Sequence, residues 1–140
     1  MLSYSRTVEI EWGDCDASGL LHTERYFALF DGNMWHMLER ALELPKGHLL
    51  ATYGAAGFPT VDLKTKFPVP SRLGDVLDIE STILALRRSS FDVRHEARKD
   101  GELRAESLDT RVWVGRSPTD PRRIEAQPLP AKLVERFRAA

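Results

Sequence analysis

The sequence predicts an α+β domain in which an antiparallel sheet packs against one long helix. A strand-like segment opens the chain, a helix-like segment of about 20 residues follows, and four more strand-like segments make up most of the rest. Asp100-Gly101, between the last two of these, is a strong hairpin signal. Short connections favour antiparallel pairing, because parallel strands need a long crossover. One helix on one such sheet is an α+β architecture.

The first element is a strand that leads into a turn. Alternate positions place these side chains on one face: Tyr4, Arg6, Val8, Ile10 and Trp12. A period of two over Tyr4–Trp12 is typical of a half-buried strand. The segment from Gly13 to Gly19 follows as a turn, and it holds Asp14 and Asp16.

The second element is a helix from about Thr23 to Leu44. Its large apolar side chains recur at spacings of three and four: Tyr26, Phe27, Phe30, Met34, Met37, Leu38 and Ala41. Thr23 or Ser18 can cap its start, and Pro45 marks its end. Gly32 lies inside it at a cost of about 1 kcal/mol relative to Ala. We therefore expect the sheet or a ligand to approach the helix closely at this point.

The remaining elements are four strands and two shorter helical segments. The expected strands are Thr60–Phe67, Val76–Leu86, Phe91–Lys99 and Leu103–Val114. We expect a helical turn over Lys46–Tyr53, an irregular segment over Ser117–Pro130, which holds four prolines, and a terminal helix over Ala131–Arg138. Residues 1–140 are predicted to form a single domain. A five-stranded sheet on one helix leaves an edge and a face uncovered, so we expect oligomerisation to cover them.

Length and charge exclude several classes of protein. A chain of 140 residues suffices for one domain with a core. The formal net charge of -1, from 20 basic and 21 acidic residues, argues against a nucleic-acid binder. No apolar run approaches the roughly 18 residues of a membrane span, and the polar start of the chain predicts no secretory signal. A single cysteine fits the reducing cytoplasm.

The acidic turn is the strongest candidate for chemistry. Asp14 and Asp16 lie directly before the expected start of the helix. A helix N-terminus carries partial positive charge and unpaired N–H donors, so it can polarise a carbonyl group. A carboxylate beside it is a candidate nucleophile or general base. Acidic residues also occur in turns for local hydrogen bonding alone, so the pattern by itself leaves both interpretations open.

The turn Gly13–Leu20, followed by Tyr26, resembles the signature of hotdog-fold thioesterases of the 4-hydroxybenzoyl-CoA thioesterase type. Three further segments resemble that family in the same order along the chain: residues 57–61, 75–80 and 87–91. The resemblance covers nearly the full length. It implies the hotdog fold, an antiparallel five-stranded sheet wrapped around a long central helix. It also implies an acyl-CoA thioesterase, with coenzyme A as part of the substrate and no separate cofactor or metal.

The resemblance assigns the reaction to two groups. Asp16 corresponds to the family's catalytic carboxylate, and the backbone N–H of about Thr23 corresponds to the donor that binds the thioester carbonyl. Asp16 would either attack the carbonyl to give a mixed anhydride or activate water, and the sequence leaves both routes open. Asp14 is expected to organise the turn by accepting backbone hydrogen bonds.

The same resemblance suggests the residues around the acyl group. His22 either lines the acyl pocket or caps the helix, and Asp31 either meets a substrate hydroxyl or is an exposed helix acid. Pro59 and Thr60 are expected to shape the pocket wall. Short-chain relatives often carry His and Asn where this chain has Thr23 and Arg25. This departure argues against the short-chain branch, and together with the match at Asp31 it favours an aromatic, hydroxybenzoyl or benzoyl type of substrate.

A basic turn is the candidate site for the nucleotide part of coenzyme A. By resemblance, Arg87 and Arg88 contact its phosphates and Ser89 adds a hydroxyl donor; a solvated turn is the alternative. The planar guanidinium suits phosphate recognition. Three further titratable residues are given no role and are expected to be surface or structural: His36, His95 and Glu96.

Other functions remain possible on the same fold. One is a broad-range thioesterase for short or medium aliphatic acyl groups on coenzyme A or acyl-carrier protein. Another is a non-hydrolytic acyl-CoA binding protein, against which the retained Asp16 argues. A hotdog dehydratase would need a paired His and acid, which His22 and Asp16 satisfy loosely. We expect a cytoplasmic homo-oligomer, either a dimer or a dimer of dimers, and the identity of the acyl group is left open.

Overall fold

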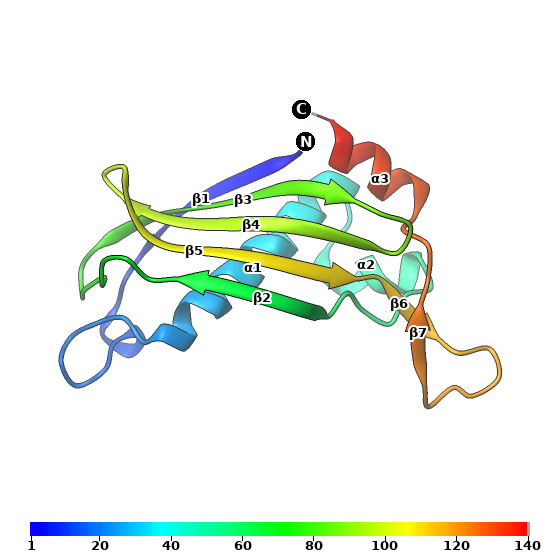
Figure 1. Ribbon diagram of the computed structural model, residues 1–140, viewed down its shortest axis with the longest axis horizontal. Coiled ribbons are helices and arrows are strands. Elements are labelled where there is room, and N and C mark those ends of the chain that lie inside the picture. Colours follow the sequence, from blue (N-terminus) through cyan, green and yellow to red (C-terminus); the bar gives the residue numbers. More distant parts are fainter. Residues whose placement is uncertain (140) are drawn as a thin grey trace.

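A five-stranded antiparallel sheet forms the body of the molecule (Figure 1). The computed structural model describes residues 1–139. The strand order is β1-β3-β4-β5-β2, and every neighbouring pair is antiparallel. The strands are β1 (Ser3–Glu9), β2 (Thr60–Lys66), β3 (Val76–Leu86), β4 (Ser90–Lys99) and β5 (Glu102–Val112). This arrangement confirms the predicted α+β class.

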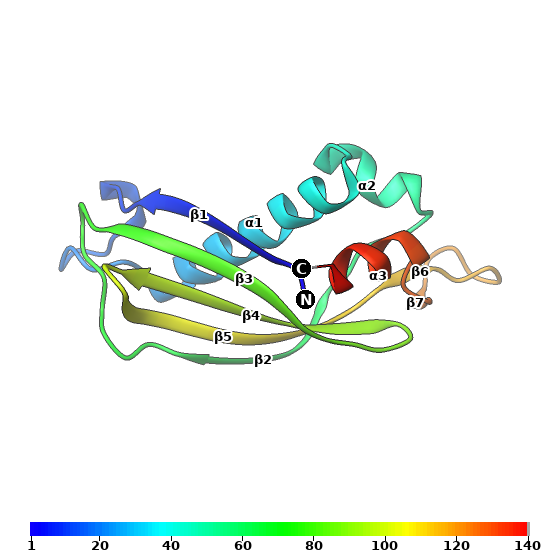
Figure 2. The ribbon, with the colours of Figure 1, turned by 90° about the horizontal axis from the view of Figure 1, so that it is seen from above.

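Helix α1 (Thr23–Leu42) lies along one face of this sheet (Figure 2). Its buried side chains follow the helical spacing: Tyr26, Leu29, Phe30, Asn33, Met34, Met37, Leu38, Ala41 and Leu42. The helix ends two residues earlier than predicted because Glu43 adopts a left-handed conformation with φ 55°. The N–H of Glu43 then closes the last turn on the carbonyl of Glu39. The expectation of one long helix against the sheet is met.

The first strand is shorter than predicted at its C-terminal end. β1 ends at Glu9, and Trp12–Asp14 form a single 3₁₀ turn, η1. The N–H of Glu11 donates to Asp14 Oδ2 at 3.0 Å, and the N–H of Asp14 donates to the carbonyl of Glu11 at 3.0 Å. These bonds turn the chain away from the sheet, so Trp12 is 71% exposed and does not share the buried face.

The C-terminal part holds a hairpin that the sequence did not predict. β6 (Val114–Arg116) pairs with β7 (Ile124–Ala126), so the prediction of an irregular segment over Ser117–Pro130 is wrong for the residues of β7. The prolines flank β7 and do not interrupt it, so the residues of β7 keep the backbone N–H groups that pair with β6. Helices α2 (Lys46–Thr52) and α3 (Ala131–Arg138) occupy the predicted segments.

The close approach of the Arg6 side chain accounts for Gly32 inside α1. The Arg6 side chain of β1 reaches over the helix, and its Nη2 donates to the carbonyl of Leu29 at 2.9 Å. A Cβ atom at Gly32 would lie 3.0 Å from that nitrogen. The close approach that the sequence predicted is therefore made by a side chain of the sheet.

The sheet leaves its two edge strands, β1 and β2, and one face open among residues 1–139. β2 pairs with β5 alone, and its Val61 and Leu63 are exposed. The face opposite α1 carries no helix of this part of the chain (Figure 2). No helix in the described residues is long and apolar enough to cross a membrane.

Candidate active site

The acidic turn holds Asp16 with one carboxylate oxygen bound and the other open. Asp16 Oδ1 accepts the Ser18 hydroxyl, the Ser18 N–H at 2.8 Å and the Leu20 N–H at 3.3 Å. Gly19, with φ 79°, allows the chain to turn back so that these donors converge. The Ser18 hydroxyl and the backbone donors hold the pKa of Asp16 below its usual value, so this carboxyl is ionised at neutral pH. Oδ2 makes no hydrogen bond within residues 1–139.

Helix α1 starts beside this carboxylate with free donors. His22 is the N-cap residue, but its side chain makes no capping hydrogen bond. The first N–H groups of a helix have no partner within it, and those of Thr23 and Glu24 find no other acceptor in the described part of the chain. The partial positive charge of the helix N-terminus adds to these donors. This end of α1 can therefore bind a carbonyl or an oxyanion.

One cavity of about 380 Å³ brings the carboxylate and the helix N-terminus together. Its wall comprises Asp16, Leu20, Leu21, His22, Thr23, Glu24, Tyr26, Phe67, Val69 and Pro70. Tyr26 is fixed in this wall by its hydroxyl, which donates to Ser71 Oγ at 2.8 Å. The structure thus places three predicted residues, Asp16, His22 and Thr23, around a single space. A carbonyl group bound there would meet a donor and a carboxylate at once.

Asp14, the other acid of the turn, is committed to structure. Its carboxylate accepts the Glu11 N–H, and it forms an ion pair with Arg25 at 2.7 Å. Asp14 does not line the cavity that contains Asp16. The turn-organising role predicted for Asp14 agrees with these contacts.

Asp31, Pro59 and Thr60 lie farther along α1 and β2. Asp31 and Thr60 line a second cavity of about 150 Å³, and Asp31 and Pro59 line a shallow cavity of about 350 Å³ beside it. Asp31 Oδ1 forms an ion pair with Arg111 Nη1 at 3.0 Å, although half of the Asp31 side chain remains exposed. Within one chain, these residues are not part of the cavity that holds Asp16.

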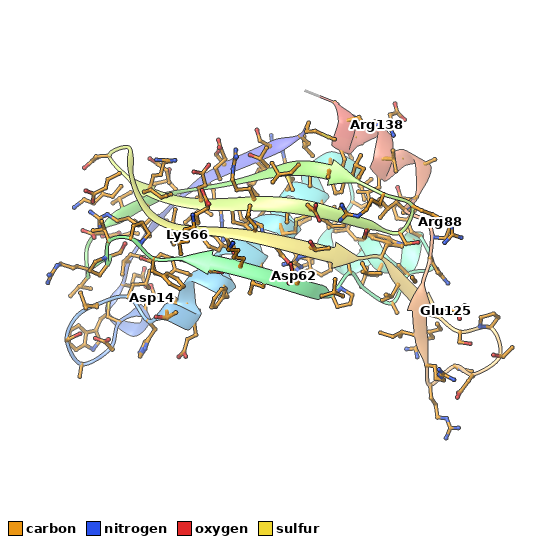
Figure 3. All side chains as sticks on the ribbon, viewed as in Figure 1. Asp14, Asp62, Lys66, Arg88, Glu125 and Arg138 are labelled. Carbon is orange, nitrogen blue, oxygen red and sulfur yellow. The ribbon has the colours of Figure 1, made fainter. Side chains whose placement is uncertain are left out.

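The basic turn lies at the opposite end of the sheet. Figure 3 shows Arg88 and Asp14 at the two ends of the long axis of the molecule. Strand β3 runs from one of these ends to the other, and its 11 residues span about 33 Å. Arg87 is held by an ion pair with Asp92, whereas Arg88 contacts Ser89 Oγ at 3.3 Å. The structure therefore does not bring the predicted phosphate-binding residues to Asp16 of the same chain.

A buried polar cluster was missed by the sequence analysis. His95, Asp109 and Arg111 are 1%, 3% and 7% exposed, and all three line the 150 Å³ cavity. His95 was expected to be either a surface residue or a structural one. Because it is buried, the expectation of a surface position is wrong. The signal was present in β4, where His95 falls in alternation between the buried residues Val93 and Ala97.

No group of three or more His, Cys, Asp or Glu side chains in residues 1–139 is placed to hold a metal ion.

Comparison with known proteins gives consistent matches over at least nine-tenths of the chain. The model of the Thioesterase-like superfamily matches residues 10–137. The 4-hydroxybenzoyl-CoA thioesterase of Pseudomonas sp. (strain CBS-3) is 28% identical over 131 residues, which cover 90% of this chain and 91% of the relative. These matches confirm the resemblance inferred from the sequence.

Solved structures agree with the same family. The structure of 4-hydroxybenzoyl CoA thioesterase from Pseudomonas sp. strain CBS-3 superposes with a TM-score of 0.86 at 27% identity, covering 96% of this chain and 98% of that one. A gentisyl-coenzyme A thioesterase gives a TM-score of 0.80 at 25% identity, covering 96% and 99%. The superpositions confirm the predicted hotdog fold.

Proposed function

The chain belongs to the Thioesterase-like superfamily, and from this premise we propose that it hydrolyses the thioester bond of an acyl-CoA to a free acid and coenzyme A. The observation that carries the proposal is the shared cavity in which Asp16 faces the N-terminus of α1. One group supplies an ionised carboxylate and the other supplies backbone donors. Together they provide a nucleophile or base and an oxyanion site.

The backbone N–H of Thr23 would bind the thioester carbonyl oxygen. Negative charge grows on this oxygen in the transition state, and a fixed donor at the positive end of a helix stabilises it. Because the donor belongs to the backbone, the Thr23 side chain is not required for this step.

Asp16 Oδ2 would act by one of two routes. In the first it attacks the carbonyl carbon, the C–S bond breaks, coenzyme A leaves as thiolate, and water then hydrolyses the mixed anhydride. In the second it removes a proton from a water molecule, whose oxygen attacks the carbonyl and expels the same thiolate. A thiolate is a good leaving group, so neither route needs a strong acid.

We propose an aromatic acyl group as the substrate class. The relatives named above act on 4-hydroxybenzoyl-CoA and gentisyl-coenzyme A. In this chain, the aromatic rings of Tyr26 and Phe67 lie 5.5 Å apart at the cavity wall. A compact aryl group would pack against these rings.

A homo-oligomer would unite residues that one chain keeps apart. The β2 edge is unpaired in the described chain and exposes Val61 and Leu63, which makes it a candidate for pairing with a second copy. Arg88 lies too far from Asp16 to reach the same substrate, so it would serve the site of another subunit. We propose a dimer or a dimer of dimers in the cytoplasm, with acyl-CoA as the ligand and no nucleic-acid partner.

A thiol-release assay on the purified protein tests this function. Benzoyl, hydroxybenzoyl, phenylacetyl, acetyl, hexanoyl and palmitoyl esters of coenzyme A form the panel. We expect aryl esters to be hydrolysed fastest, and Asp16→Asn to lower kcat by about 10²–10⁴-fold. Preference for hexanoyl or palmitoyl esters would instead identify an aliphatic thioesterase.

Two results would contradict hydrolysis itself. One is tight binding of acyl-CoA without release of thiol, which would identify a binding protein. The other is full activity in Asp16→Asn, which would remove this carboxylate from the mechanism. Light-scattering measurement of the molar mass in solution tests the oligomer separately.

A further inference from the structure

The connection between β2 and β3 crosses one end of the sheet. This β2–β3 connection, residues 67–75, passes the ends of β5 and β4, which lie between the two strands that it joins (Figure 1). Three of its residues, Phe67, Val69 and Pro70, line the cavity that contains Asp16. The position of the connection therefore shapes one wall of the candidate active site.

The acidic turn is attached to this connection by backbone hydrogen bonds. The Asp16 N–H donates to the Leu20 carbonyl at 2.8 Å, so the two arms of the turn pair with each other. The second arm then pairs with the connection. The Leu21 N–H donates to the Ser71 carbonyl at 2.8 Å, and the Leu73 N–H donates back to that arm at 3.1 Å. Asp16 is thus located relative to the sheet through two successive pairings.

Ser71 attaches the same connection to α1. Its hydroxyl oxygen accepts the hydrogen bond of the Tyr26 hydroxyl, and Tyr26 lies in the first turn of the helix, three residues after Thr23. Ser71 is 1% exposed, so water does not compete for these contacts. One residue therefore holds the acidic turn through its carbonyl and the start of α1 through its side chain. The distance from Asp16 to the N–H of Thr23 depends on where Ser71 lies.

Arg104 of β5 fixes the connection on both sides of Ser71. Its Nη1 donates to the Pro70 carbonyl at 3.0 Å and to Asp75 Oδ2 at 3.2 Å, and it lies 3.5 Å from Ser71 Oγ. The Arg104 and Asp75 side chains are each 12% exposed, so salt screens this ion pair less than a surface pair. A single guanidinium nitrogen thus joins the residue before Ser71 to the last residue of the connection.

We propose that Arg104 is a positioning residue for thioester hydrolysis, which holds Ser71 in place and thereby aligns Asp16 with the N–H of Thr23. The inference rests on the proposed acyl-CoA hydrolysis. Arg104 does not line the cavity, so it acts on the reaction through the connection and not by touching the substrate. Reaction rates depend steeply on the alignment of the reacting groups, so loss of its contacts lowers kcat more than it weakens binding.

Hydrogen exchange followed by NMR tests the contacts without a substrate. Arg104→Met keeps an aliphatic side chain and removes the guanidinium. We expect the Leu21 and Leu73 amides to exchange at least about 10-fold faster than in the wild type, because their acceptors are no longer held. Arg98→Met is the matched control, since this arginine of β4 binds Glu96 instead, and its exchange should match the wild type. Unchanged exchange in Arg104→Met would overturn the inference.

Steady-state kinetics with benzoyl-CoA test the effect on the reaction. Arg104→Met, assayed where circular dichroism shows it folded, should lower kcat about 10-fold with KM within about 2-fold of the wild type. Arg98→Met should change neither constant. Wild-type kcat in folded Arg104→Met would overturn the inference alone. If the wild type hydrolysed no ester of the panel, the proposed function itself would be contradicted.

A second variant keeps the test decisive if Arg104→Met does not fold. Arg104→Lys retains the charge, but its nitrogen lies one bond closer to the backbone than Nη1 and cannot reach the Pro70 carbonyl and Asp75 together. We expect its kcat to be about 3-fold below that of the wild type, with KM unchanged. Wild-type kcat in Arg104→Lys would show that a charge near Asp75 suffices, and it would overturn the inference.

Discussion

Arg25 Nε lies 2.7 Å from Asp14 Oδ1, and this ion pair joins the acidic turn to the first turn of α1. This ion pair matters because Asp16 lies on the turn, whereas the N–H proposed to bind the thioester carbonyl belongs to the helix. Asp14 also accepts the Glu11 N–H, so it ties three segments together. Asp14 and Asp16, two residues apart, therefore have separate tasks: one holds the geometry and the other faces the cavity.

Replacing Asp14 should affect rate through position and not through chemistry. The Arg25 side chain is 49% exposed, so the ion pair contributes at most about 1 kcal/mol to stability. We expect Asp14→Ala to lower kcat by about 10-fold, far less than Asp16→Asn, because a displaced turn misaligns the reacting groups. Arg25→Gln should reproduce part of this loss. Steady-state kinetics distinguish the cases, and an Asp14→Ala defect as large as that of Asp16→Asn would place Asp14 in contact with the substrate.

Ser18 sets the pH range in which Asp16 is active. In the proposed mechanism the ionised carboxylate is the reactive form, and the Ser18 hydroxyl is the largest of the contacts that lower its pKa. Wild-type kcat/KM should therefore persist to a pH below the usual aspartate range. Removing the hydroxyl in Ser18→Ala should raise the pKa of Asp16 and move the acid limb of the profile to higher pH. An unchanged acid limb would show that another group titrates there.

The parts of the fold that depend on periodicity were predictable. Alternation identified the strands of the sheet, and spacings of three and four identified α1, because one face of each element is buried. Trp12 was misplaced because the alternation continues past Glu9, while the hydrogen bonds of Asp14 end the strand. The three-residue strand β7 was missed because it is too short to show a period.

The candidate site was predictable only where one short segment supplies it. Asp16, His22 and Thr23 are close in sequence, so turn and helix signals sufficed. His95 and Asp109 meet only through the pairing of β4 with β5, in which Val93 is the partner of Asp109. Their contact depends on a register that no local pattern encodes.

Gly32 and Arg6 offer a test of the packing between β1 and α1. Gly32→Ala should gain about 1 kcal/mol of helix propensity but displace the Arg6 guanidinium, whose bond to the Leu29 carbonyl is worth about 1.5–3 kcal/mol. We expect a net loss of stability in the wild type. In an Arg6→Ala background the same change should be stabilising. Denaturant unfolding of the wild type, the two single variants and the double variant measures the coupling between positions 6 and 32. Equal effects of Gly32→Ala in both backgrounds would refute the contact.

Asp75 should link acid stability to the wall of the candidate active site. Partial burial opposes the shift, but the Arg72 N–H and Lys99 keep the pKa of Asp75 below its usual value. Arg104, at 3.2 Å, connects Asp75 to the Pro70 carbonyl in that wall. Since the folded pKa is lowered, this stabilisation is present above the unfolded pKa and is lost as the pH falls through the folded one.

We expect Asp75→Asn to cost about 1–2 kcal/mol at neutral pH and to flatten the loss of stability in acid. Urea unfolding at a series of pH values checks both effects. Glu102→Gln, which removes an exposed partner of the same Arg104, is the control and should change neither. If the free energy of unfolding of Asp75→Asn fell with pH as steeply as that of the wild type, the acid sensitivity would belong to other carboxylates.

Arg88, and not Arg87, should govern recognition of the nucleotide. Arg87 is already neutralised by Asp92, and its Nε donates to Ser90 Oγ at 2.8 Å, so it stabilises the turn. Arg88 has no acidic partner within residues 1–139 and can bind a phosphate. Arg88→Ala should raise KM for acyl-CoA several-fold with little change in kcat, whereas Arg87→Ala should mainly lower stability.

Two controls isolate the phosphate contact. An acyl thioester of N-acetylcysteamine lacks the nucleotide, so its KM should not respond to Arg88→Ala. Arg122→Ala removes the same charge from a side chain that is 92% exposed, and it should leave KM for acyl-CoA at the wild-type value. Because Arg88 and Asp16 lie at opposite ends of one chain, a KM effect restricted to acyl-CoA would also mean that two subunits share each substrate. Equal effects on both thioesters would remove Arg88 from the nucleotide site.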